Sequence, residues 1–187
     1  MTKKPYAVGI ARRQQILEAA GELFSVRGYR GASMRDVAAQ VNLTLAGVLH
    51  YFPSKEELLE SVLQQRTDTS VPWFEQRWEE TGSFRQTMME LAGRNMADPG
   101  MVRLFVTLSA EATDPTHPAH DFFVKRYRTS RELFSRTIER AQARGEVNSR
   151  ASGPQLIAVL DGLQVQWLLE PSFDLAGELS RYLDTIA

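Results

Sequence analysis

The sequence has 187 residues, of which 43% are hydrophobic and 24% charged, and its formal net charge at pH 7 is −1. This composition is ordinary for a globular protein with a sizeable core, and the absence of cysteine excludes disulfides and thiol chemistry. No apolar run reaches the length of about 18 residues that spans a membrane, and the N-terminus has no apolar signal segment. We therefore expect a cytoplasmic protein of one or two domains.

Positive charge is concentrated toward the N-terminal end. Lys and Arg outnumber Asp and Glu in residues 1–55, whereas acidic residues are in excess in residues 56–187. Such an asymmetry favours a polyanionic partner, nucleic acid above all, for the basic part. Chance is the alternative, because the excess is modest.

Apolar residues recur at helical spacing almost throughout, without strand-like alternation of useful length. In the N-terminal part, capping residues divide this pattern, since Ser33, Thr44 and Ser54 each precede a helix. Gly28 ends the first helix and Pro53 ends the third. The expected spans are 16–28, 33–40, 44–51 and 54–63.

The pattern changes at residues 66–72, where polar residues and Pro72 indicate a bend or a boundary. Five further helices are expected: one from Ser83, one from Asp98, a long one ending at Gly145, and two covering 153–170 and 173–186. We therefore predict an all-α chain of about nine helices. It divides into a flexible arm at 1–10, a first domain at 11–66 and a helical bundle at 67–187.

The two short helices at 33–40 and 44–51, joined by a tight turn, form a helix-turn-helix. In such a unit the second helix enters a DNA major groove about 12 Å wide, so its leading face must be slender. Thr44, Ala46 and Gly47 satisfy this requirement. The apolar anchors expected to hold the helix on its neighbours are Leu43, Val48 and Phe52.

The stretch ILEAAGELFSVRGYRGASMRDVAAQVNLTLAGVLHYFPSKEELLESV resembles the N-terminal domain of TetR/AcrR-type transcriptional regulators. The resemblance is close over residues 12–63, and the joint spacing of many positions makes it more specific than a lone helix-turn-helix. These positions are Ile16, Ala20, Leu23, Phe24, Gly28, Tyr29, Asp36, Val37, Ala38, Phe52, Lys55, Glu56 and Leu58. It implies a three-helix domain that binds double-stranded DNA, followed by an all-α domain, here 67–187, that binds an effector and dimerises.

Three positions depart from the family pattern. Leu49 stands where the family often has an aromatic residue that touches the DNA backbone, and Leu45 replaces a common polar residue. Asn42 replaces a glycine in the turn, and asparagine tolerates the left-handed conformation. The two leucines motivate an alternative function, an all-α small-molecule-binding protein without specific DNA binding.

The resemblance assigns DNA contacts to Ser33, Arg35, Thr44, Leu45, Ala46, Gly47, Leu49, His50, Tyr51 and Lys55. Arg35 would reach a guanine edge, and residues 44–47 would face bases or the thymine methyl group. His50, Tyr51 and Lys55 would meet phosphates. A solvated Arg35 is the alternative, as are packing roles for His50 and Tyr51.

The last two helices carry more apolar residues than the surface of a monomer needs. The dimer interface is expected at Leu156, Leu160, Leu163, Trp167, Leu175, Leu179, Tyr182 and Leu183. Gly162 would let a neighbouring helix approach closely. The resemblance implies a homodimer, whose two recognition helices would lie about 34–36 Å apart on a palindromic operator. The alternative is that these residues only cover the preceding long helix.

The resemblance also implies an effector pocket between the bundle helices. Its candidate lining is Trp73, Phe74, Trp78, Met88, Phe105, Phe123, Tyr127, Gln164 and Trp167, each with ordinary core packing as the alternative. Asn95, Asp161 and Gln166 are further polar candidates. The composition favours a small apolar or aromatic effector.

Enzymatic chemistry is not expected, because the sequence has no Gly-rich phosphate loop, no Cys nucleophile and no paired acid–base motif. We predict no cofactor and no catalytic residue. His117 and His120 are interpreted as loop and cap residues rather than as metal ligands. The expected function is a ligand-responsive DNA-binding regulator, most often a repressor in this family, without a membrane partner.

Overall fold

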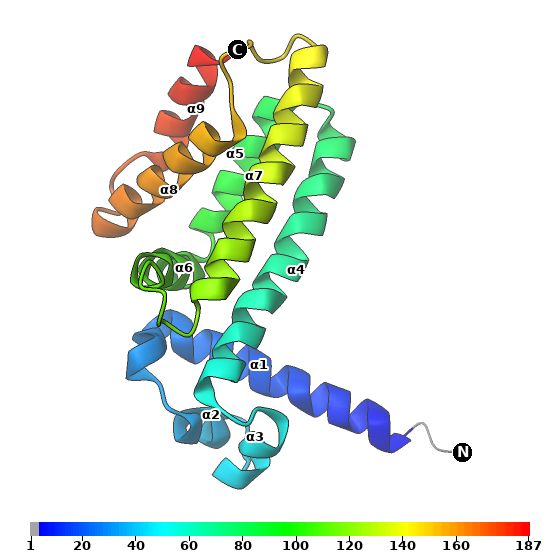
Figure 1. The fold of residues 1–187 in the computed structure, drawn as a ribbon, viewed down its shortest axis with the longest axis vertical. Helices are drawn as coiled ribbons and strands as arrows, with labels where there is room; N and C mark the ends of the chain where they lie inside the picture. The colour runs from blue at the N-terminus through cyan, green and yellow to red at the C-terminus, as the bar shows by residue number, and fades with distance from the viewer. Residues whose placement is uncertain (1–3) are drawn as a thin grey trace.

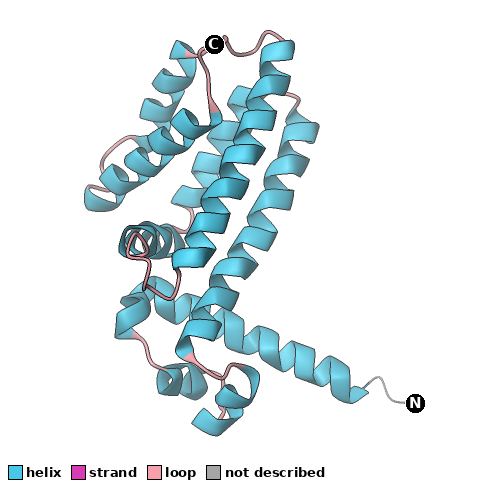
Figure 2. Cartoon of the chain, viewed as in Figure 1, coloured by secondary structure: helices cyan, strands magenta, loops and turns pink. Residues whose placement is uncertain are grey.

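The computed structural model describes residues 4–187, and every regular element within them is a helix (Figures 1 and 2). The predicted all-α fold class is confirmed. The nine helices of this part are α1 (Lys4–Gly31), α2 (Met34–Gln40), α3 (Leu45–Tyr51), α4 (Lys55–Thr81), α5 (Phe84–Met96), α6 (Pro99–Glu111), α7 (His120–Ala143), α8 (Gly153–Leu169) and α9 (Leu175–Thr185). None of these helices is long and apolar enough to cross a membrane.

Helix α1 corrects the expected N-terminal arm. The helix already begins at Lys4, so residues 4–10 are helical rather than an arm, and residues 1–3 lie outside the described residues. Near its other end, Gly28 has a φ of 72° and a ψ of 164°, which breaks the helical path before Gly31. Glycine adopts this conformation without a Cβ clash, so the predicted stop at Gly28 is confirmed as a kink.

Helix α4 runs unbroken through the expected domain boundary at 66–72. It spans Lys55–Thr81, with the exposed Pro72 inside it, and ends at Gly82, which has a φ of 61°. Pro72 removes one backbone donor, but burial of Phe74 and Trp78 beyond it stabilises the continued helix. The predicted end of the fourth helix near residue 63 is therefore wrong, and one long helix joins the two ends of the molecule (Figure 1).

Two hydrophobic cores lie along this long helix. The N-terminal core combines α1–α4 with residues of α6 and the start of α7, and its buried members include Phe24, Val48, Leu58, Leu104 and Phe122. The bundle core combines the second half of α4 with α5–α9. Because α6 and α7 contribute to the N-terminal core, that core does not end at residue 66.

The bundle core uses most residues expected at the dimer interface. Leu156, Leu160, Leu163, Trp167, Leu175, Leu179 and Leu183 are all buried inside this single chain. Helices α8 and α9 turn these side chains toward one another and toward α5–α7. Their assignment to a surface that meets another subunit is therefore corrected. Only Tyr182 of that set is partly exposed.

The outward face of α8 is different in character. Ala158, Gly162, Val165 and Leu169 are exposed, with 40% of Val165 and 81% of Leu169 accessible. Their spacing of four, three and four residues places them in one stripe along the helix. A Cβ added at Gly162 would meet nothing within 4 Å, so the surface beside it is open.

Candidate functional site

The turn between α2 and α3 has the tight geometry that the helix-turn-helix requires. Asn42 has a φ of 54°, so it adopts the predicted left-handed conformation. The amide of Leu43 then donates to the carbonyl of Ala38 at 2.9 Å. Beyond the turn, Val48 and Phe52 are buried at 0% and 2% exposure, which confirms them as anchors of α3.

Capping fixes where the two short helices begin. The Ser33 side chain accepts from the Asp36 amide, and the Asp36 carboxylate accepts from the Ser33 amide at 2.8 Å, so both halves of a capping box are present. The Ser33 hydrogen bonds lower the pKa of Asp36. At α3, Thr44 Oγ1 accepts from the Gly47 amide at 3.1 Å. Two helices of about two turns are thereby held in fixed orientation.

The residues expected to contact DNA are all at least partly exposed. Ser33, Arg35, Thr44, Ala46, Leu49 and His50 are exposed, and Leu45, Gly47, Tyr51 and Lys55 are partly exposed. The expected set therefore remains available to a partner. Leu49 is 38% exposed, so this apolar residue is not required by the core.

The polar end of α3 is built from aromatic contacts. The His50 and Tyr51 rings meet edge to face with centroids 5.2 Å apart, and His50 is exposed. Lys55 Nζ lies 4.3 Å from the centre of the Tyr29 ring. Partial burial there lowers the pKa of Lys55. A lysine held over a ring presents its charge from a defined position.

Tyr29, a family-pattern residue given no functional role in the sequence analysis, links α1 to the start of α4. Its hydroxyl donates to Glu56 Oε1 at 3.2 Å. Burial, followed by the charge of Glu56, raises the pKa of Tyr29 to about 12. Arg13 contributes a second unpredicted contact, because its Cζ lies 4.6 Å from the centre of the Phe52 ring. Arg13 therefore connects α1 to Phe52, the C-cap residue of α3.

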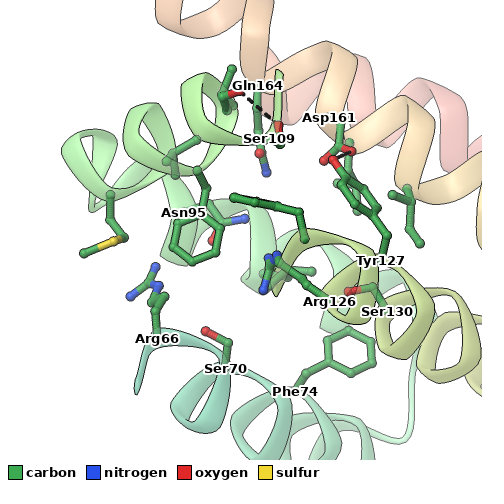
Figure 3. A pocket seen from close by; sticks show the side chains of 18 of the residues that line it. Arg66, Ser70, Phe74, Asn95, Ser109, Arg126, Tyr127, Ser130, Asp161 and Gln164 are labelled. Carbon is green, nitrogen blue, oxygen red and sulfur yellow. Dashed lines mark hydrogen bonds between the residues drawn. The ribbon is translucent and has the colours of Figure 1, made fainter. Parts of the chain in front are cut away.

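A cavity of about 300 Å³ opens inside the bundle, between α4, α5, α6, α7 and α8 (Figure 3). Of the predicted lining residues, Phe74, Phe105, Phe123, Tyr127 and Gln164 do line it, as do Asn95 and Asp161.

Trp73, Trp78, Met88 and Trp167 do not line it, and Gln166 is exposed on α8 instead. Trp78, Met88 and Trp167 are buried in the bundle core and Trp73 packs against it, so their assignment to the pocket is corrected.

Three arginines in the cavity wall were missed by the sequence analysis. Arg66 comes from α4, Arg94 from α5 and Arg126 from α7, and Figure 3 shows Arg66 and Arg126 at the rim and the middle of the cavity. Hydrophobic periodicity gives no signal for an inward position of an arginine, because it follows apolar residues only. The cavity wall therefore carries more charge than the candidate lining named from the sequence.

One carboxylate faces these arginines from α8. Asp161 Oδ2 accepts from the Tyr127 hydroxyl at 2.8 Å (Figure 3). Burial raises the pKa of Asp161, and burial together with the Asp161 charge raises the pKa of Tyr127 to about 12. The pair closes one side of the cavity and holds the Tyr127 ring in place.

The cavity and the helix-turn-helix share two helices as connections. Helix α4 begins at Lys55, beside α3, and passes the cavity at Arg66, Ser70 and Phe74. Helix α6 lines the cavity and crosses α1 closely, because a Cβ added at Gly100 would lie 3.0 Å from Ser25 Cβ. Displacement of either helix by a ligand would therefore move the helix-turn-helix.

Known proteins share this architecture. Residues 16–62 match the family model described as bacterial regulatory proteins of the tetR family. The chain is 25% identical to the HTH-type transcriptional regulator TtgR of Pseudomonas putida, over 92% of this chain and 88% of TtgR. It is also 25% identical to the HTH-type nicotine-responsive transcriptional repressor HdnoR of Paenarthrobacter nicotinovorans, over 95% of this chain and 96% of HdnoR.

Solved structures agree with these relatives. A TetR-family transcriptional regulator from Agrobacterium tumefaciens superposes with a TM-score of 0.83 over 96% of this chain and 99% of that chain, at 18% identity. The matched residues 16–62 cover the helix-turn-helix, and the superposition extends through the bundle that holds the cavity. Residues 16–62 therefore form a helix-turn-helix domain of the tetR family, and the chain as a whole has the fold of TetR-family transcriptional regulators.

Proposed function

We propose that this regulator is a repressor that binds a palindromic operator as a homodimer and leaves it when a small molecule occupies the bundle cavity. The observation that carries the proposal is the direct connection of both sites by α4. Its first residue, Lys55, lies at the exposed edge of the helix-turn-helix, and Arg66, Ser70 and Phe74 of the same helix line the cavity.

At the DNA end, the proposed contacts divide by chemistry. Thr44, Ala46 and Gly47 form a narrow leading edge on α3 that suits the floor of the major groove. Arg35 on α2 is exposed, in position to donate to a guanine edge. Lys55 is the strongest candidate for a phosphate contact, because its ammonium stands over the Tyr29 ring beside the same edge.

A shift of α4 and α6 is the proposed route from effector to DNA. The relative HdnoR is described as a nicotine-responsive repressor, which is a precedent in this family for release by a small molecule. In a dimer, a small rotation of each helix-turn-helix changes the separation of the two recognition helices. Binding fails once that separation no longer matches one turn of DNA.

The outward stripe of α8 is the proposed dimer surface. Ala158, Gly162, Val165 and Leu169 are exposed and mostly small, so a second copy of α8 can approach closely along them. Leu169, at 81% exposure, is an apolar side chain without cover in the single chain. This surface replaces the buried residues named from the sequence. The domains proposed are a DNA-binding unit at 11–66 and an effector and dimerisation unit at 67–187, joined by α4.

Selection of random duplex DNA with the full-length protein tests the proposal. The expected result is an enriched palindrome whose two halves are centred about one helical turn apart. A Thr44→Tyr variant, which widens the leading edge of α3, should lose the enrichment while its circular dichroism stays unchanged. Recovery of random sequences alone would contradict specific DNA binding and favour an all-α small-molecule-binding protein.

Sedimentation tests the dimer separately. The wild-type chain is expected to sediment as a dimer at micromolar concentration, and Gly162→Glu, which places a charged side chain in the α8 stripe, should sediment as a monomer. Gly93→Glu is a matched control, because Gly93 is also an exposed helical glycine with open space around it. A monomeric wild type would refute the homodimer.

A further inference from the structure

We propose that the effector is an amphipathic organic anion, whose apolar body fills the cavity and whose negatively charged head is bound by Arg94 and Arg126. This inference rests on the proposed effector role of the cavity and specifies its ligand class. It departs from the apolar or aromatic ligand that the composition suggested. The argument starts from the charges in the cavity wall.

Arg66 is the arginine of this wall whose charge is already balanced. Its Nη1 lies 3.5 Å from Oδ2 of Asp98, the N-cap residue of α6. Asp161 accepts its hydrogen bond from the Tyr127 hydroxyl and forms no ion pair among the described residues. The lining contains three arginines and this one carboxylate, so the cavity carries an excess of positive charge.

Arg94 is the clearest unsatisfied group. It forms no ion pair among the described residues, and its Nη1 is buried without a hydrogen-bond partner. Burial and the nearby charge of Arg66 lower the pKa of Arg94. A buried donor left unsatisfied destabilises the folded protein, because it has lost its hydrogen bonds to water without replacement. An acceptor supplied by a ligand would remove this cost.

Arg94 is also held in place. Its Cζ lies 4.6 Å from the centre of the Trp73 ring, which fixes the plane of the guanidinium and leaves its edge for a planar acceptor. Carboxylates match that fork geometry with two parallel hydrogen bonds. Trp73 therefore also supplies a fluorescent reporter next to the proposed head-group site.

Arg126 provides a second cation that forms no ion pair among the described residues, although the charge of Asp161 acts on it. Its guanidinium stacks 4.6 Å from the centre of the Phe105 ring, and its Nη1 donates to Thr67 Oγ1 at 3.2 Å. Burial lowers the pKa of Arg126. Figure 3 shows its side chain extending into the middle of the cavity, beside Tyr127 and Ser130. An anion there would be stabilised by both arginines at low local dielectric.

The other side chains of the cavity wall determine which apolar part of a ligand fits. Apolar side chains dominate this wall, among them Phe74, Met101, Phe123, Leu133 and Leu160. A volume of about 300 Å³ is at the small end of the range for small-molecule sites. The combination fits a molecule with one compact charged head and an aromatic or short aliphatic body. A metal chelator, a sugar or a cation would leave most of this wall unmatched.

Two matched probe sets test this ligand class on the full-length protein. The first is decanoate, decanamide and decylamine, and the second is biphenyl-4-carboxylate with its amide. Affinities are measured by calorimetry and by tryptophan fluorescence. Each carboxylate is expected to bind at least tenfold more tightly than its amide, and decylamine is expected to bind weakest. Equal affinities within a set, tighter binding of decylamine, or failure of both carboxylates to bind would overturn the inference.

Variants then locate the head-group site. Arg94→Met should reduce the carboxylate-to-amide affinity ratio about tenfold, whereas Arg103→Met, at an exposed position of α6 outside the cavity, should leave it unchanged. Because Arg94→Met removes an unsatisfied buried donor, its thermal midpoint without ligand should equal or exceed that of the wild type. A preserved ratio in Arg94→Met would refute the assignment of Arg94. Arg126→Met serves as the second variant, with the same expected loss of the ratio.

These measurements need no DNA, so they separate the ligand class from the regulatory role. Carboxylate preference without an enriched operator would refute the proposed regulatory function and keep the ligand class. An enriched operator with no head-group preference would refute the ligand class and keep the proposed regulatory function. Where both hold, decanoate should weaken operator binding and decanamide should do so only at much higher concentration.

Discussion

The helix-turn-helix lies beside the start of α4 and the bundle cavity beside its middle, and the two are built in different ways. At the N-terminal end, position follows from local contacts, such as the Ser33–Asp36 capping box and the Thr44 cap. In the bundle, residues far apart in the chain create the site, since Arg66, Arg94 and Arg126 come from three helices. The comparison teaches that one helix can join a locally specified helix-turn-helix to a cavity that only tertiary packing specifies.

The largest expected effect comes from emptying either core. Phe52 and Phe84 are each 2% exposed, one in each core, and replacement by alanine should cost about 3–5 kcal/mol of unfolding free energy. Because Leu104 and Phe122 of α6 and α7 belong to the N-terminal core, both variants should lower one shared transition. Urea unfolding followed by circular dichroism and tryptophan fluorescence checks this, since all three tryptophans lie within 73–167. Two separate transitions would mean that the DNA-binding unit unfolds alone.

The second-largest effect is expected at the contact between α6 and α1, where the bundle meets the N-terminal region. A Cβ at Gly100 would lie 3.0 Å from Ser25 Cβ and 3.1 Å from its carbonyl oxygen, so Gly100→Val should push α6 away from α1 at a cost of about 1–3 kcal/mol. We expect operator affinity to change, as measured by fluorescence anisotropy. Gly93→Val, in open space on α5, is the control. Unchanged operator affinity would argue against α6 as a connection.

Two substitutions at the proposed DNA-binding surface separate the recognition of bases from the electrostatic attraction to phosphates. Arg35→Ala should relax base preference at one position by about 1–3 kcal/mol. Lys55→Ala should weaken all sequences alike and reduce the salt slope by about 0.9, as expected for one phosphate. Binding titrations at several salt concentrations check both, with Arg150→Ala in the exposed α7–α8 loop as control. An unchanged salt slope for Lys55→Ala would refute its phosphate contact.

A smaller effect is expected from the α3 cap. Thr44→Ala removes the acceptor for the Gly47 amide, now 3.1 Å away, and should cost about 1 kcal/mol of stability. Thr44→Ser retains the oxygen and should restore most of the loss. Denaturant midpoints measure the stability term, and operator binding measures any additional contact. Equal stability of the alanine and serine variants would show that the cap contributes little.

The smallest effect compares one tyrosine from each region. The pKa values of Tyr29 and Tyr127 are both raised to about 12, by burial first and then by Glu56 or Asp161. An unfolded tyrosine ionises near pH 10, so between about pH 10 and 12 the unfolded state loses a proton that the folded state keeps. The unfolding free energy should therefore fall as pH rises through this window. Each Tyr→Phe variant should flatten that fall in urea midpoints, and an unaltered pH dependence would contradict the shift.

Much of the N-terminal fold was predictable, because its signals span only a few residues. Asn42 was expected to be left-handed and has a φ of 54°, and Val48 and Phe52 were expected to be buried and are. The end of α4 was not predictable in this way. Pro72 indicates a boundary locally, but burial of Phe74 and Trp78 against the bundle outweighs the lost hydrogen bond.

For the bundle, hydrophobic periodicity identified apolar faces without identifying their neighbours. The sequence pattern predicts a dimer surface at Leu156, Leu160 and Leu163, but these residues are buried in the bundle core. The smaller stripe at Ala158 and Gly162 is exposed instead. Both faces of α8 are apolar, so the sequence of this helix alone does not show which face is buried. Contact with the rest of the chain decides which face remains outside.

The sequence by itself determined the helices, their caps, the helix-turn-helix and the family resemblance, because hydrogen bonds and backbone preferences act between residues three or four apart. Only the tertiary structure decided the cavity and its charge. An arginine on an amphipathic helix points to solvent or to the interior according to which helix packs beside it, and that depends on residues dozens of positions away. Arg94, buried beside Trp73 with Nη1 unsatisfied, is the case in which this difference carries the most functional consequence.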